Sequence, residues 1–187
     1  MVEKPMAVTE ADCREIAAAC EESGVFLAVC HVLRYFPPVV KIKEIIESGA
    51  IGDVVTINHT ENVGYWHFAH SFVRGNWRNE AESTFSLMAK CCHDMDLIYY
   101  WMGETPATSI QSFGSLHHFK PSSKPPNASG RCLSCAAEPD CPYSARKIYL
   151  SPPARHWPMT VVCDIEDESG DYAQSLTRAL ETGPYGK

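Results

Sequence analysis

A continuous apolar run, Val25 to Cys30, restricts the fold more than any other feature of the sequence. Such a run is typical of a strand that is buried on both faces, as in a parallel sheet covered by helices. A predicted helix comes just before it, because Thr9 can cap a helix start, apolar residues follow at helical spacing, and Gly24 can end the helix. A helix that leads into a buried strand predicts an α/β (α+β) fold.

The same alternation of helices and strands continues along the chain. Pro37 and Pro38 favour the start of a second helix, which Gly49 ends, and Gly103 ends a third. The predicted elements are helices at 9–24, 37–49, 83–102 and 171–181, strands at 25–30, 54–63, 108–113 and 159–165, an irregular segment at 64–82, and an extended Pro-, Ser- and Cys-rich insertion at about 114–142.

The charge and hydropathy of the chain exclude several classes of protein. Its 187 residues carry 16 Lys and Arg against 23 Asp and Glu, a formal net charge of −7, which argues against a nucleic-acid partner. No apolar stretch approaches the roughly 18 residues that span a bilayer, and the N-terminus has no apolar signal core. We therefore expect a soluble, cytoplasmic protein without a membrane partner, and we interpret its nine cysteines as reduced thiols.

Two short motifs carry groups suited to acid–base chemistry. Lys4 precedes the first helix, where an ammonium group could hydrogen-bond a sugar hydroxyl or assist proton transfer. A solvated lysine is the alternative. His93 and Asp96 are three residues apart in the third helix, so they share a face and Asp96 could orient the imidazole. His93 is thereby a candidate general acid or base, and a core histidine is the alternative.

An aromatic and basic segment provides candidate substrate-binding groups. Rings stack on the C–H faces of sugars while polar groups bind their hydroxyls. The segment could therefore line a sugar or polyol site through Trp66, His67, His70 and Arg74. Packing of the rings in a domain interface is the alternative.

Three cysteines of the insertion, Cys132, Cys135 and Cys141, are candidate metal ligands. Tetrahedral zinc takes thiolate and imidazole ligands, so closely spaced cysteines in an insertion suit a structural zinc site. Its fourth ligand would be His117, His118, His156 or Cys163. A second C-x2-C pair is missing, and plain free thiols are the alternative.

The order of several short motifs resembles that of a known family. The motifs are Glu3-Lys4-Pro5, Arg34-Tyr35-x-Pro37, Glu47-Ser48-Gly49-x-Ile51-Gly52, His93-x-x-Asp96 and Trp101-Met102-Gly103. Over most of residues 2–113 this order and spacing resemble the glucose–fructose oxidoreductase / inositol dehydrogenase (Gfo/Idh/MocA) family. The segments 131–150 and 180–187 resemble a subgroup of it.

The resemblance implies two domains and a hydride-transfer reaction. Residues 1–36 would be the end of a Rossmann domain that binds NAD or NADP, and residues 37–187 an open-sheet substrate and oligomerisation domain that lacks its last strands. The intact form would be a homo-oligomer that transfers hydride between the nicotinamide and a CH–OH carbon of a small-molecule sugar or polyol.

The resemblance also implies roles for single residues. Lys4 and His93 would be catalytic, and the cofactor would lie against Glu3, Lys4, Pro5 and Arg34. With the aromatic segment, the predicted substrate-binding residues are Trp66, His67, His70, Arg74 and Asp96. Many members carry an aspartate where this chain has Ala89, so part of the usual proton-handling set is absent, with Lys90 as a candidate substitute.

The sequence contains no G-x-G-x-x-G motif, whose backbone amides hold a pyrophosphate at a helix N-terminus. We therefore expect an internal fragment of such an oxidoreductase, which binds NAD(P) weakly and turns over little or nothing on its own. The alternatives are a non-catalytic oligomerisation or interaction module and a small structural-zinc protein.

Overall fold

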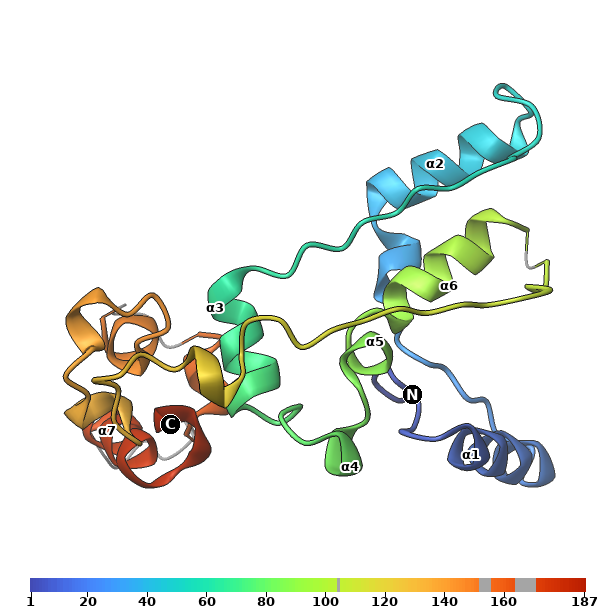
Figure 1. The fold of residues 1–187 in the computed structure, drawn as a ribbon. Coiled ribbons are helices and arrows are strands. Elements are labelled where there is room, and N and C mark those ends of the chain that lie inside the picture. The colour runs from blue at the N-terminus through green and yellow to red at the C-terminus, as the bar shows by residue number, and fades with distance from the viewer. Residues whose placement is uncertain (104, 152–155, 164–170) are drawn as a thin grey trace. The chain divides into compact units, whose positions relative to one another are not determined.

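The structure, a computed structural model, describes residues 1–103, 105–151, 156–163 and 171–187. These residues are mostly helical, without a paired sheet (Figure 1). The α-helices are α1 (Glu10–Glu22), α2 (Pro37–Glu47), α3 (Tyr65–Phe68), α4 (Glu80–Ser83), α5 (Ser86–Ala89), α6 (Cys92–Trp101) and α7 (Tyr172–Thr182). The shorter 3₁₀ and π turns are η1 (Val32–Tyr35), η2 (Ala69–Arg74), η3 (Pro121–Ser123), η4 (Cys132–Ser134), η5 (Glu138–Asp140), η6 (Arg146–Leu150), η7 (Met159–Val161) and η8 (Pro184–Gly186).

The chain divides into two compact units that are each discontinuous in sequence. Unit 1 consists of residues 1–62 and 79–112, and unit 2 of residues 63–78 and 113–187. The two units are defined by compactness alone. They do not test the predicted domain boundary between residues 36 and 37, which stays a prediction.

Local capping explains the three helices that the sequence predicts well. Thr9 accepts a hydrogen bond from the backbone N–H of Asp12 at 3.1 Å and begins α1. Pro37 occupies the first turn of α2, where its missing N–H costs nothing. Asp171 accepts from the backbone N–H of Ala173 at 3.0 Å and begins α7.

The predicted helix at 83–102 is interrupted, and the predicted irregular segment at 64–82 is partly helical. Lys90 and Cys91 separate α5 from α6, and only α6 runs without a break up to the predicted stop at Gly103. Gly103 adopts φ +68°, a conformation that glycine tolerates best. In the other segment, α3 continues directly into the π turn η2.

The predicted strands are wrong throughout the described part of the chain. Residues 25–30 make one isolated parallel bridge, between Val29 and Val2, and Phe26 is fully exposed. Residues 54–63 and 108–113 form no strand, and Val55 is 91% exposed. The predicted strand at 159–165 forms η7 instead, and its last two residues lie outside the described ranges. Strand-like sequence needs a neighbouring strand to bond its backbone groups, and the described residues supply none.

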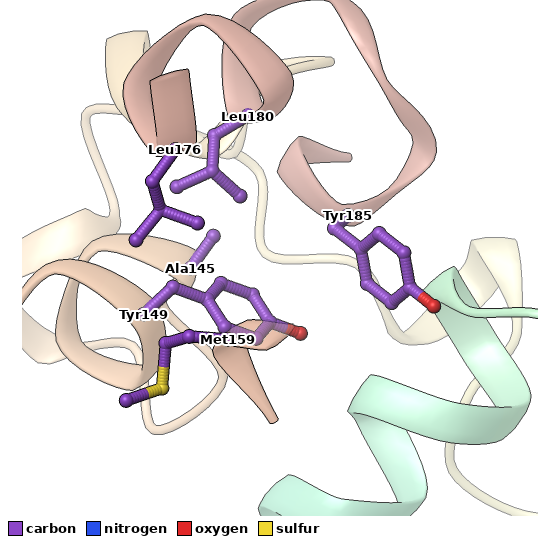
Figure 2. Packing of buried hydrophobic residues seen from close by; sticks show 6 residues of the cluster. All are labelled: Ala145, Tyr149, Met159, Leu176, Leu180 and Tyr185. Carbon is purple, nitrogen blue, oxygen red and sulfur yellow. The ribbon is translucent and has the colours of Figure 1, made fainter. Parts of the chain in front are cut away.

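The hydrophobic core of unit 2 forms around α7. It consists of Ala145, Tyr149, Met159, Leu176, Leu180 and Tyr185. Leu176 and Leu180 extend from α7 toward Ala145 and Tyr149 of the neighbouring turn (Figure 2). Leu180 is fully buried, and such a side chain contributes about 2–3 kcal/mol by leaving water.

In unit 1, α2 packs beside α6, as Figure 1 also shows. Val39 of α2 and Leu97 of α6 are buried. The ammonium group of Lys43 donates to the carbonyl oxygen of Tyr100 near the end of α6, at 2.8 Å. These contacts fix α6, whose first turn carries His93.

The helices in the described ranges are all too short or too polar to cross a membrane.

Candidate active site

Lys4 and the residues just before α6 meet in unit 1. The ammonium group of Lys4 donates to the backbone carbonyl of Ala89 at 3.1 Å, across 85 residues of sequence. Ala89 is buried at the end of α5. At the position where the family resemblance implies an aspartate, the partner of the lysine is therefore a backbone oxygen. Of the neighbouring motif residues, Glu3 is exposed and Pro5 is half-buried.

His93 lies in the first turn of α6, close to Lys4. Its Nδ1 is buried, with no hydrogen-bond partner among the described residues. Burial is the main cause that lowers the pKa of His93 below its usual value, and the positive charge of Lys4 is the next. The imidazole is therefore neutral at neutral pH and can accept a proton.

Asp96 does not orient His93, although the sequence suggested this arrangement. Its carboxylate accepts two hydrogen bonds from the guanidinium group of Arg34, at 2.7 and 2.8 Å. Nδ1 of His31 lies 3.8 Å from the same carboxylate. Helical spacing places His93 and Asp96 near each other, but the bidentate pair with Arg34 takes up both carboxylate oxygens.

His31 is a site residue that the sequence reasoning missed. Its ring lies edge-on to that of His93, with centroids 6.1 Å apart, and its charge contributes to lowering the pKa of His93. A usable signal was its position directly after the apolar run at 25–30, because ligand-binding groups often follow buried strands.

The sequence prediction also missed two polar pairs in unit 1. His59 lies 2.5 Å from the carboxylate of Asp94, which is buried in α6. Lys90 lies 2.9 Å from Glu61. Lys90 is the candidate substitute for the aspartate expected at position 89. Its positive charge is balanced by the carboxylate of Glu61. Nothing in the helical spacing of α6 indicates partners 30 or so residues away.

The predicted substrate-binding segment belongs to unit 2. His70 and Arg74 are buried in η2. Nδ1 of His70 shares a hydrogen bond of 2.8 Å with the hydroxyl group of Tyr149. Arg74 donates to the backbone carbonyls of Tyr143 and Lys187. These contacts hold the interior of unit 2 together.

Trp66 and His67 lie on α3, toward the surface of unit 2. Both rings lie against Trp157, with centroids 5.4 and 4.9 Å from it. The predicted substrate-binding set is thus divided, since Asp96 belongs to unit 1 and the other four residues to unit 2. Its role in binding stays a prediction.

The structure does not gather the three cysteines of the insertion into a metal centre. In the described ranges, no group of three or more His, Cys, Asp or Glu side chains could hold a metal ion. Cys132 instead accepts a hydrogen bond from Arg74 at 3.3 Å, and Cys135 accepts one from the backbone N–H of Ser129 at 3.4 Å.

Comparison with known proteins identifies a family and several relatives of this chain. Residues 43–138 match the family model described as the C-terminal alpha/beta domain of the Gfo/Idh/MocA oxidoreductase family. A putative oxidoreductase of Bacillus subtilis, YteT, is 31% identical over 150 residues, which are 78% of this chain and 35% of that protein. No solved structure matches the chain.

Two other relatives carry the names of defined enzymes. The 2,7-anhydro-N-acetylneuraminate hydratase of Escherichia coli is 29% identical over 64% of this chain and 31% of its own length. The trans-1,2-dihydrobenzene-1,2-diol dehydrogenase of Mus musculus is 26% identical over 63% of this chain and 33% of its own length. The chain thus spans about a third of the length of these relatives.

Proposed function

The chain belongs to the Gfo/Idh/MocA oxidoreductase family, and from this premise we propose that it carries the proton-handling side of an NAD(P)-dependent oxidation of a sugar or polyol CH–OH group. His93 is the general base, and Lys4 acts beside it. The observation that carries the proposal is the half-buried imidazole of His93 next to the charge of Lys4: its Nδ1 is buried, and its pKa lies below the usual value. The dehydrogenase name of the mouse relative supports the reaction class.

The two side chains have complementary tasks in such a reaction. A neutral His93 accepts the hydroxyl proton as the C–O bond gains double-bond character. The ammonium group of Lys4 stabilises the negative charge that develops on the oxygen. Ala89 uses one of the three N–H donors of this ammonium group and holds it in place, so further donors can face a substrate oxygen.

We expect the reacting end of a nicotinamide cofactor to lie against Lys4, whose ammonium group keeps N–H donors beyond the one that Ala89 accepts. NAD(P)⁺, when bound, supplies the acceptor for the hydride that leaves the carbon. Lys4 would lie at the nicotinamide and the substrate hydroxyl, flanked by Glu3 and Pro5. Arg34 is paired with Asp96 and lies 4.8 Å above the Tyr100 ring, so its place at the cofactor stays a prediction.

A titration of His93 tests the proposal without relying on turnover, because we expect the chain alone to bind NAD(P) weakly. NMR spectra of the histidine ring protons recorded across pH give the pKa of His93 in the wild type and in Lys4→Met. Removing the charge of Lys4 should raise this pKa. Lys41→Met is the matched control, because Lys41 is an exposed lysine that pairs with Glu44 on α2.

Two outcomes would contradict the proposed pair. One is a wild-type His93 that titrates at its ordinary value of about 6.5. The other is a pKa that Lys4→Met leaves unchanged. Where oxidation of a polyol with NAD⁺ can be detected, His93→Gln should reduce the rate about 10²-fold or more.

A further inference from the structure

Unit 2 contains a cavity whose wall is rich in aromatic side chains. Its volume is about 560 Å³, within the usual range of small-molecule sites. Tyr65 and Trp66 of α3 line one part of it, and His156 and Trp157 line another. Trp157 played no part in the substrate-binding prediction from the sequence.

Trp157 is held in position by three other rings. The centroids of Trp66, His67 and His70 lie 5.4, 4.9 and 5.3 Å from that of Trp157. Trp157 nevertheless remains 43% exposed and lines the cavity. A large ring that its neighbours hold in place loses little side-chain entropy when a ligand binds. Because this ring is also open to solvent, a ligand can stack on it.

The polar groups of the cavity are balanced in charge. Asp140 contributes a carboxylate and Lys147 an ammonium group. The ammonium group donates to the backbone carbonyls of Pro139 and Cys141, at 2.5 and 3.4 Å, which hold it at the wall. Nδ1 of His156 lies 2.5 Å from the carbonyl oxygen of Trp157, so in the neutral ring Nδ1–H donates there and Nε2 is left as an acceptor.

We propose that this cavity binds a neutral sugar or polyol ring that stacks on Trp157. Aromatic rings meet the C–H face of such a ligand, while the carboxylate, the ammonium group and the imidazole meet its hydroxyls. The balanced charges favour a neutral ligand over an acidic sugar. The ligand class rests on the proposed function, whereas the site itself is independent of Lys4 and His93.

Tryptophan fluorescence provides the test, with the full chain titrated separately with D-glucose, myo-inositol and D-glucuronate. We expect a saturable change with a neutral probe, with weaker binding of D-glucuronate. Trp157→Ala should weaken binding about tenfold, and Trp157→Phe, which keeps a ring, should weaken it less. Trp77→Ala is the matched control, because Trp77 is 39% exposed, lies in the same unit and does not line the cavity.

The outcomes distinguish binding in this cavity from binding elsewhere on the chain. A second cavity of about 730 Å³ shares Asp140, Cys141 and Pro142 with this one, but no tryptophan lines it, so binding there would not depend on Trp157. No saturable change with any probe, unchanged binding in Trp157→Ala with its circular dichroism preserved, or tightest binding of D-glucuronate would each overturn the proposal. The titration of His93 in the wild type and in Lys4→Met needs no ligand, so failure of the proposed chemistry would be seen separately.

Discussion

Acidification should destabilise unit 2 through one buried histidine. His70 is fully buried, it shares a hydrogen bond with Tyr149, and its Nε2 has no partner among the described residues. Burial, followed by the nearby charges of His67 and Arg74, lowers the pKa of His70 to about 4. Protonation would place a second positive charge beside Arg74 in the interior of the unit.

The sign and size of the effect follow from this lowered pKa. In the unfolded chain the pKa of His70 is about 6.5, so between these two values the unfolded state binds more protons and the free energy of unfolding falls as pH falls. This histidine alone should lower that free energy by about 2 kcal/mol between pH 7 and pH 5 and by about 3 kcal/mol at pH 4.

The assay compares wild type with His70→Gln, whose amide cannot titrate, by guanidinium unfolding at pH 7, 6 and 5. The stability advantage of the wild type over the variant should shrink by about 2 kcal/mol from pH 7 to pH 5. His117→Gln, at an exposed histidine, is the control and should leave the pH dependence unchanged. An advantage that is equal at pH 7 and pH 5, or a folded-state NMR titration of His70 near pH 6.5, would refute the reasoning.

Three further predictions concern packing and ion pairing, each measured by guanidinium unfolding. Leu180→Ala should cost about 3 kcal/mol, because it opens a cavity in the core around α7, and a change below about 1 kcal/mol would contradict that core. Gly186→Ala should cost about 2 kcal/mol or more, since a Cβ there would lie 1.7 Å from the backbone oxygen of Leu180. Gly130→Ala meets nothing within 4 Å and should be nearly neutral. Arg34→Lys should cost about 1 kcal/mol, because lysine cannot make the bidentate pair with Asp96, and an unchanged unfolding midpoint would argue against that pair.

The helices were predictable where short-range chemistry decides them. Thr9 and Asp171 cap their helices through atoms two or three residues away, and Pro37 fits a first turn by its own geometry. The break at Lys90 was not visible, because the apolar spacing continues across it. Strands failed for a different reason: alternation describes one strand, whereas a sheet also requires a partner.

The candidate active site was predictable only in part. Lys4 and His93 were candidates from their motifs, the resemblance implied their catalytic roles, and the structure places both residues in one unit. The pairing of Asp96 with Arg34 crosses 62 residues, and that of His59 with Asp94 crosses 35. Such long-range contacts depend on how helices and loops pack, so spacing along one helix does not indicate them.

The route of the chain through the two units has a consequence for dissecting the protein. The backbone passes between the units three times, after residues 62, 78 and 112. No single proteolytic cut therefore releases either unit as an intact, separate piece. A terminal deletion cannot isolate unit 2 either, because residues 63–78 precede a stretch of unit 1. Isolating that unit requires an internal splice that joins residues 63–78 to residues 113–187.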